Sequence, residues 1–398
     1  MFWTNRRIRN VVLILATLLY FRLGVEIFAD SSKHKTFFLG DFPAFYISGQ
    51  LLDYPVAERY QLKLQRILEN NRFPSLKGNY FYVAYPPYAL LLYSPLAWAS
   101  PQISRIIYAL LVLVAGLVAA YLLSTLASDK LEKQIIFLAT ITFPSFLFSL
   151  HTGQNSIMLL LAALMTWRLL TGQREALAGV TLAVFWIKPH YALMLLVVMG
   201  LLRFWKTLVI FLTAGVFCYA IGYFLSDGEW LIDWLKMTQW FYLDNLMRSS
   251  HVIISLPMAL DYFSTLGFPA QKPLNLVLWL FYLYCLGLIS YNLYQSSSAE
   301  LEVRAEQFLL VVALLSFFAP YAMYYDFVLI LPALVILGRE ERGNKFLIYC
   351  YALAYLALLE IHFIFSASPA VPLLAGVNFA AAVWIIQKRF TINSRELA

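Results

Sequence analysis

Three ionisable side chains stand beside apolar segments of this chain of 398 residues. Asp41 begins a polar stretch shortly after the first apolar segment, Lys188 separates two short apolar segments, and Asp326 begins another. A charge in such a place is costly and by default indicates a functional site. A carboxylate can accept a proton from an attacking hydroxyl, and an ammonium can hold a phosphate as a point charge. These residue types could therefore act on a lipid phosphate headgroup at a membrane surface.

Each of the three residues also has a structural interpretation, which the sequence leaves open. Asp41 precedes Phe42 and Pro43 and could cap a short helix. Lys188 could extend from the end of a helix to the outer headgroups. Asp326 could cap the helix that it begins, or pair with Lys188 across a cavity.

Further polar side chains lie at expected turns. His151, Gln154 and Asn155 surround the bend at Thr152-Gly153, between two apolar segments. They could bind hydroxyl groups of a ligand or orient a base, but they could equally form a turn with a helix cap. His190 could contact a phosphate or pack beside the proline that precedes it.

Basic residues and cysteines elsewhere predict no additional site. The basic residues of the first polar stretch recur at helical spacing, which is typical of a solvated helix face: Arg59, Lys63, Arg66 and Arg72. The three cysteines lie inside apolar segments without metal-ligand spacing, so no metal site is expected.

The composition requires a non-aqueous environment. Hydrophobic residues make up 62% of the chain and charged residues 13%, whereas a soluble domain has about 25% charged residues. Apolar segments near the roughly 20 residues that cross a bilayer recur along the chain. The net charge of +7 comes from basic residues beside these segments, where they set orientation, and not from a nucleic-acid surface. We therefore predict one all-α, polytopic membrane domain over residues 1–398.

The hydropathy pattern predicts about a dozen spans. They are expected near 10–29, 104–127, 134–150, 155–170, 176–188, 190–202, 207–225, 273–294, 305–320, 324–338, 346–365 and 370–387. Lys and Arg gather in alternate turns, which places both termini in the cytoplasm. No clean cleavage site follows the first apolar segment, so we expect it to be retained.

Two polar regions are expected on the outer face. The first outer loop covers residues 30–103, and its apolar part at 86–98 is short and rich in proline, so it should lie along the interface as helices. Residues 226–265 alternate aromatic and charged side chains and predict an interfacial lid. The two short segments that meet at Lys188-Pro189-His190 predict a broken helix, which is tolerated where it lines a cavity.

The order of several motifs resembles glycosyltransferase family 87. The similar parts are residues 41–52, Tyr60, residues 81–88 and 94–97, Gly153-Gln154-Asn155, Ala178-Gly179, Ile187-Lys188-Pro189, Arg203-Phe204-Trp205, Pro320-Tyr321 and Tyr325-Asp326. The resemblance covers residues 37 to 340. Tyr325-Asp326 stands where actinobacterial members often have His-Tyr.

The resemblance implies a fold of the GT-C type and transfer, with inversion, of a sugar from a polyprenyl phosphate. Asp41 matches the family's loop aspartate and would be the catalytic base, while Lys188 and His190 would bind the donor phosphate. The sugar or the acceptor would contact Tyr46, Tyr85, His151, Gln154, Asn155, Tyr325 and Asp326. Asp41 is followed by Phe42 and not by a second acid, so neither a metal nor any other cofactor is expected.

These observations predict an inverting glycosyltransferase that moves a sugar, mannose in the first instance, to a lipid-linked or glycan acceptor. Its partners would be the polyprenyl-phosphate sugar, the acceptor and membrane lipids. The protein would lie in the inner, or plasma, membrane with its active site on the periplasmic or extracellular side. A transporter or flippase of a lipid-linked sugar is the alternative, because a lysine between broken helices also occurs in transporters.

Overall fold

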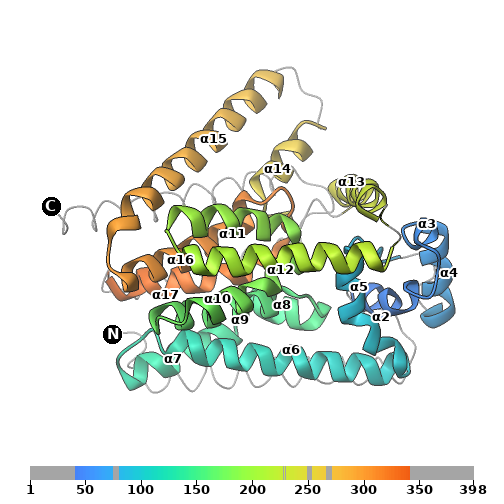
Figure 1. The fold of residues 1–398 in the computed structure, drawn as a ribbon, viewed down its shortest axis with the longest axis horizontal. Coiled ribbons are helices and arrows are strands. Elements are labelled where there is room, and N and C mark those ends of the chain that lie inside the picture. Colours follow the sequence, from blue (N-terminus) through green and yellow to red (C-terminus); the bar gives the residue numbers. More distant parts are fainter. Residues whose placement is uncertain are drawn as a thin grey trace.

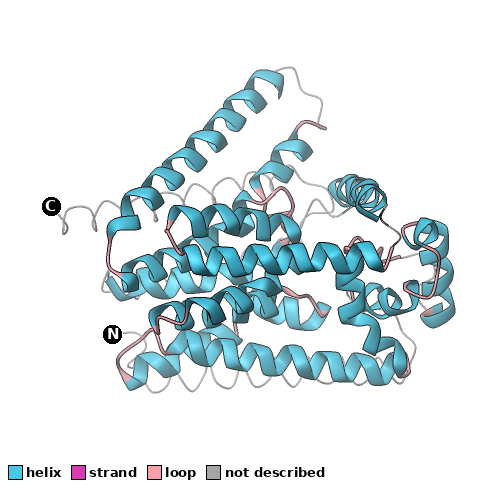
Figure 2. Cartoon of the chain, in the orientation of Figure 1, coloured by secondary structure: helices cyan, strands magenta, loops and turns pink. Residues whose placement is uncertain are grey.

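The structure is a computed structural model that describes residues 41–340, except 75–79, 227, 229, 249–252 and 266–270. Regular structure in this part is helical (Figure 2), apart from one antiparallel bridge between Ile253 and Met323. The elements are α2 (Phe42–Leu51), α3 (Val56–Arg59), α4 (Leu62–Arg72), α5 (Pro87–Tyr93), η2 (Ser94–Trp98), α6 (Pro101–Ser124), α7 (Lys130–Ile141), α8 (Pro144–Thr152), α9 (Ser156–Thr171), α10 (Glu175–Leu182), η3 (Ala183–Ile187), α11 (Pro189–Leu201), α12 (Trp205–Phe224), α13 (Trp230–Arg248), α14 (Leu256–Phe263), α15 (Gln271–Gln295), η5 (Ser296–Ser298), α16 (Leu301–Phe318), η6 (Tyr324–Ile330) and α17 (Leu331–Glu340). The all-α prediction is therefore confirmed for the described residues.

Three helices of the described part are long and apolar enough to cross a membrane: Pro101–Ser124, Trp205–Phe224 and Asn275–Ser298. A fourth span would be formed if α7 and α8, which are bent by 48° relative to each other, cross as one unit. Large apolar side chains on α12 and α15 are exposed, as lipid-facing surfaces require. These helices support an integral membrane protein. The predicted total of about twelve spans is not shown by them, and the expected spans at 10–29, 346–365 and 370–387 lie outside the described residues.

Several of the expected spans are short helices because proline interrupts them. Pro144 separates α7 from α8 inside the segment expected at 134–150, and Pro189 separates η3 from α11. Proline lacks the N–H that would continue the helical hydrogen bonds, and its ring clashes with the preceding turn. The predicted break at residues 188–190 is confirmed, since Lys188 has the non-helical angles φ −118° and ψ 84°.

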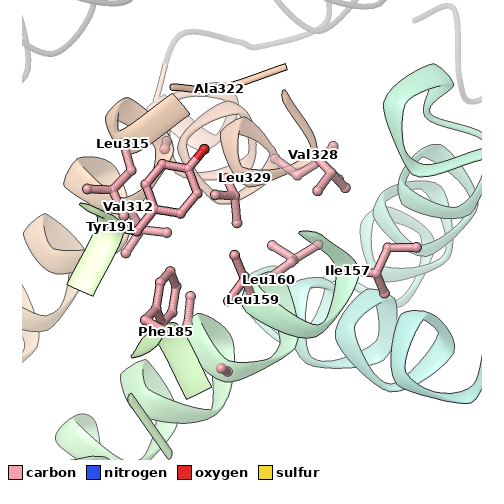
Figure 3. Close-up of a cluster of buried hydrophobic side chains, with 14 of the residues drawn as sticks. Ile157, Leu159, Leu160, Phe185, Tyr191, Val312, Leu315, Ala322, Val328 and Leu329 are labelled. Atoms are coloured by element: carbon pink, nitrogen blue, oxygen red, sulfur yellow. The ribbon is translucent and has the colours of Figure 1, made fainter. Parts of the chain in front are cut away.

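The helices of the described part form a bundle with α2 to α5 at one end (Figure 1). Helices α6, α9, α10, α12 and α16 run along the bundle, whereas α2 to α5 gather at its right-hand end and α13 lies just above them. Helix α16 is the centre of the core, because its residues from Gln307 to Phe318 are buried on all sides. Figure 3 shows side chains of η3, α9, α11, α16 and η6 meeting in one apolar cluster, including Phe185, Leu160, Tyr191 and Leu315.

Close packing holds the broken helix in place. Trp186 in η3 donates from Nε1 to the carbonyl of Phe211 at 3.0 Å. Its indole lies against Gly215 of α12, where an added Cβ would come within 2.2 Å of the ring. Any larger residue at position 215 would therefore displace the segment that leads to Lys188.

The prediction that Arg59 belongs to a solvated helix face is wrong. Its side chain is only 7% exposed, and it donates to the carbonyls of Leu225 at 2.6 Å and Tyr54 at 2.9 Å. The last carbonyls of a helix have no partner within the helix, and Arg59 satisfies one just beyond the end of α12. Lys63, Arg66 and Arg72 are exposed, as expected.

Candidate functional site

A cavity of about 400 Å³ opens between α2, residues 80–86, the broken helix and α13. Six segments that are far apart in the sequence line it: the start of α2, residues 80–86, the end of α8 with Gln154, the break at 187–190, one face of α13, and residues 321–325. Asp41 and Lys188 both lie in its wall, so the two groups that the sequence singled out share one chamber.

Asp41 begins α2, but its side chain makes no capping hydrogen bond. Its carboxylate instead accepts a hydrogen bond from Nε2 of Gln154. The backbone N–H of Asp41 donates to the carbonyl of Thr152 at 3.2 Å, which ties the start of α2 to the end of α8. The Asp41 carboxylate is therefore held by the turn after α8 and is directed to the cavity.

The electrostatic surroundings of Asp41 suit a proton acceptor. Burial raises the pKa of Asp41 above its usual value, and the charge of Asp326 adds to this effect. The hydrogen bond from Gln154 and the charge of Lys188 act in the opposite direction but do not cancel the rise. A carboxylate with a raised pKa is a better base near neutral pH.

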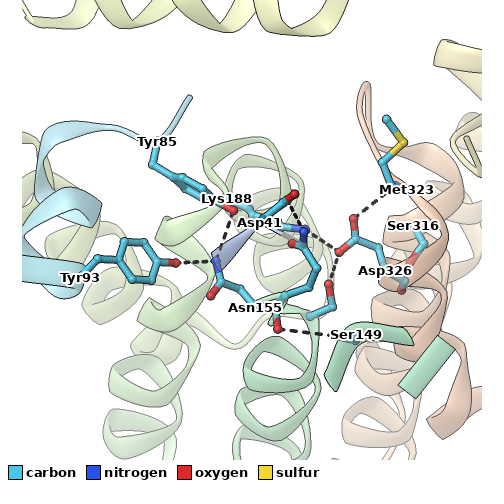
Figure 4. A network of polar contacts seen from close by, with 11 residues as sticks. Asp41, Tyr85, Tyr93, Ser149, Asn155, Lys188, Ser316, Met323 and Asp326 are labelled. Atoms are coloured by element: carbon cyan, nitrogen blue, oxygen red, sulfur yellow. Dashed lines mark hydrogen bonds and ion pairs between the residues drawn. The ribbon is translucent and has the colours of Figure 1, made fainter. Parts of the chain in front are cut away.

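The turn at residues 153–155 positions two cavity residues at once. Gly153 ends α8 with φ 70°, in the left-handed region. Gln154 then reaches Asp41. Asn155 is directed toward Tyr85 and Tyr93, as Figure 4 shows. The Asn155 amide donates to the hydroxyls of Tyr93 at 2.5 Å and Tyr85 at 3.3 Å. Asn155 thereby orients Tyr85, which lines the cavity, whereas Asn155 itself does not.

Lys188 is paired inside the protein. Its Nζ lies 2.5 Å from Oδ1 of Asp326, and the two residues are 5% and 0% exposed. The ammonium also lies 5.0 Å from the ring centre of Tyr325 and 5.4 Å from that of Tyr191. Lys188 therefore points inward and not toward outer headgroups. An ammonium has three N–H donors, and the one in the Asp326 pair leaves others for a ligand in the cavity.

Asp326 has both of the structural roles that the sequence left open. Oδ1 accepts from Lys188 and from the hydroxyl of Ser156. Oδ2 accepts from the backbone N–H of Met323 at 3.4 Å, which closes the first turn of η6 (Figure 4). Asp326 does not line the cavity, but it stands behind Lys188 and holds it.

The other expected site residues divide into two groups. His190 and Tyr325 line the cavity. Nε2 of His190 is buried and has no hydrogen-bond partner among the described residues, so it can contact a ligand. Tyr46 and His151 do not line the cavity, and Tyr46 donates to the carbonyl of Ala99 at 2.9 Å in the core.

Residues 80–86 form a wall of the cavity, and Tyr85 was the one residue of this segment that the sequence indicated as a site residue. Two side chains of α4 hold this extended segment as a neighbouring strand would. Gln65 accepts from the N–H of Val83 at 2.9 Å, and Glu69 accepts from the N–H of Phe81 at 3.1 and 3.2 Å. Burial raises the pKa of Glu69 to about 8, the Phe81 hydrogen bond opposes this rise, and the charge of Asp41 adds to it.

Helix α13 supplies another wall, with side chains that were not expected as site residues. They recur at helical spacing, which is the signal that could have revealed them: Trp234, Thr238, Phe241, Tyr242, Asp244 and Asn245. Nε1 of Trp234 donates to the carbonyl of Ala84 at 2.9 Å, so α13 is fastened to the wall formed by residues 80–86.

The fold and the site define a helical membrane protein with an interhelical cavity that holds a buried carboxylate and a buried ammonium. Residues 82–323 match the model of glycosyltransferase family 87, which is more than half of the chain, and the chain belongs to this family. Family membership implies that the protein is a glycosyltransferase. Neither the curated proteins nor the solved structures contain a match. The matched range includes Lys188, while Asp41 and Asp326 lie outside it.

Proposed function

We propose that the chain is an inverting glycosyltransferase that uses a polyprenyl-phosphate sugar, with mannose as the first donor to test. The acceptor is a lipid-linked or glycan hydroxyl on the outer face of the membrane. One observation carries the proposal: the carboxylate of Asp41 and the ammonium of Lys188 line the same cavity of about 400 Å³. This volume lies within the range of small-ligand sites.

The chemistry assigns one task to each group. The acceptor oxygen attacks C1 of the donor sugar from the face opposite the phosphate, and its proton passes to the Asp41 carboxylate. The bond from C1 to the phosphate oxygen breaks, and the polyprenyl phosphate leaves with the electron pair. Lys188 stabilises the negative charge of this leaving group, and His190, which lines the cavity beside it, is the second residue in contact with the phosphate. Because the phosphate leaves readily, we expect no general acid and no metal ion, and transfer should persist in EDTA.

The topology supports this assignment. We propose a GT-C fold of about twelve spans in the inner, or plasma, membrane, with both termini in the cytoplasm and residues 30–103 and 226–265 outside. Basic residues in alternate turns support this orientation. The cavity then faces the outer leaflet, where a lipid-linked donor presents its headgroup.

The test is transfer of labelled mannose from polyprenyl-phosphate mannose to a membrane-lipid extract by the purified full chain. Asp41→Asn should lower turnover by about 100-fold or more, since a positioned base contributes about 10²–10⁴-fold, while donor binding persists. Asp53→Asn, an exposed carboxylate of the same loop, is the matched control and should transfer like the wild type. Equal transfer by Asp41→Asn and the wild type would remove Asp41 as the base. Failure of the wild type with this donor, but success with another, would change the sugar or the carrier.

A further inference from the structure

The face of α13 that lines the cavity combines aromatic and polar side chains. Phe241 and Tyr242 bring rings to the wall, and Asp244 and Asn245 follow directly with a carboxylate and an amide. The mechanism above uses none of these four residues. They lie in the same cavity as Asp41, so any molecule that reaches the base also reaches α13.

Helix α13 is held firmly enough to act as part of a binding site. Trp240 packs edge-on against Tyr82 with ring centres 4.7 Å apart. Phe241 packs against Tyr321 at 5.7 Å, and the hydroxyl of Tyr242 donates to Asp261 of α14 at 2.5 Å. These contacts place α13 on both the outer loop and the segment before η6.

The chemistry of this face selects an uncharged polyol. Aromatic rings pack against the C–H face of a sugar ring, a carboxylate accepts hydrogen bonds from hydroxyls, and an amide both donates and accepts. The negative charge of Asp244 repels the phosphate of a lipid-linked donor. Lys188 and His190, which suit that phosphate, lie on a different wall. The cavity is thus divided into a part for an anion and a part for neutral hydroxyls.

We propose that the α13 face at Phe241, Tyr242, Asp244 and Asn245 is the subsite for the acceptor, and that it binds an uncharged sugar ring. This inference rests on the proposed function, because it takes Asp41 as the base that the bound hydroxyl must reach. The acceptor is therefore a saccharide with neighbouring free hydroxyls, whether it is carried on a lipid or is part of a soluble glycan.

Asp244 has a second neighbour that the test must separate from the sugar. The Asp244 carboxylate lies close enough to Arg66 to stabilise its guanidinium charge. Arg66 itself donates to the hydroxyl of Tyr82 at 2.7 and 2.9 Å, on the wall formed by residues 80–86. If Asp244 served only this charge pair, loss of Arg66 would have the same effect as loss of Asp244.

The experiment measures saccharide binding without requiring turnover. The full chain in lipid nanodiscs is applied to an array of neutral oligosaccharides, as wild type, Asp244→Asn, Asn245→Leu, Arg66→Gln and Asp233→Asn. Asp233 is the matched control, since it lies on α13, pairs with Lys236 at 3.4 Å and does not line the cavity. Thermal unfolding shows which variants are folded, and the Asn245 variant provides a second route if Asp244→Asn is not.

We expect Asp244→Asn and Asn245→Leu to weaken glycan binding by about tenfold or more, as loss of a hydrogen bond to a charged or buried group does. Asp233→Asn and Arg66→Gln should bind like the wild type. The proposal is overturned if no glycan is retained by the wild type, if both cavity variants bind normally, or if Arg66→Gln reproduces the loss.

A kinetic measurement separates this inference from the proposed function. With polyprenyl-phosphate mannose, Asp244→Asn should raise the KM for the acceptor by about tenfold and leave the KM for the donor unchanged. The assay is run with a lipid extract and with soluble glycans, which distinguishes the two carriers. If transfer occurs but the KM for the acceptor is unchanged in Asp244→Asn, the proposed subsite is wrong and the proposed function is not. If glycan binding depends on Asp244 but no transfer occurs, only the proposed donor is wrong.

Discussion

The ion pair between Lys188 and Asp326 permits a test that separates its structural role from its functional role. The distance of 2.5 Å between Nζ and Oδ1 corresponds to a gross attraction of about 7 kcal/mol at an effective dielectric constant of about 20. The loss of hydration of two buried ions offsets most of this energy, at several kcal/mol for each ion. The net contribution of the pair to stability is therefore small. Removal of one partner, however, leaves the other charge buried and uncompensated.

We predict that Lys188→Met and Asp326→Asn each destabilise the protein by about 3–5 kcal/mol. The double variant should lose only about 1–3 kcal/mol, because no charge remains buried and the new amide lacks at most one partner. The asparagine oxygen can still accept from Ser156. The assay is the midpoint of unfolding in mixed SDS micelles, followed by donor binding and transfer at a temperature where each variant is folded.

The double variant decides the question of function. It should be folded but should bind polyprenyl-phosphate sugar weakly, since the ammonium that faces the cavity is absent. If the double variant lost as much stability as the two single variants together, the pairing would be refuted. Donor binding at the wild-type level in the folded double variant would refute the phosphate role of Lys188.

Three further changes test the surroundings of the base. Gln154→Leu should lower kcat by about tenfold or more with little change in the donor KM, because Asp41 loses the group that orients it. The wild type should lose up to roughly 5 kcal/mol of stability as the pH is raised, and Glu69→Gln should not show this loss. The folded-state pKa of Glu69, about 8, lies above its ordinary 4.5, so this contribution is present below pH 4.5 and is lost as the pH rises through 8. Gly153→Ala should cost about 1–2 kcal/mol, because φ is 70° and the new Cβ would lie 3.3 Å from the ring of Tyr108.

Each of these changes has an outcome that would contradict its reasoning. A Gln154 variant that alters the donor KM and not kcat would place that amide on the substrate. A pH profile of unfolding that is the same for Glu69→Gln and the wild type would show that this carboxyl is not the titrating group. A Gly153→Ala variant that is as stable as the wild type would mean that the turn accommodates a side chain without strain.

Much of the architecture follows from local sequence. Apolar segments and their flanking prolines act over a few residues, so the helical class and the break at Lys188-Pro189 could be predicted directly. The costly placement of Asp41 and Lys188 beside apolar segments likewise identified them as the two principal candidates. A charge beside an apolar segment is costly in any fold, so its presence indicates a role.

What the groups contact was decided only by the tertiary structure. Gln154 meets Asp41 across 113 positions, and Lys188 meets Asp326 across 138. Helical spacing made Arg59 look solvated, but the side chain is buried and donates to the carbonyl of Leu225, just beyond the end of α12. Helical periodicity tells which residues share a face, but it does not tell which distant segment that face will meet. The hydrogen-bond partner of a buried polar group is set by packing, and in this protein packing joins α2, α8, α11, α13 and η6 around one cavity.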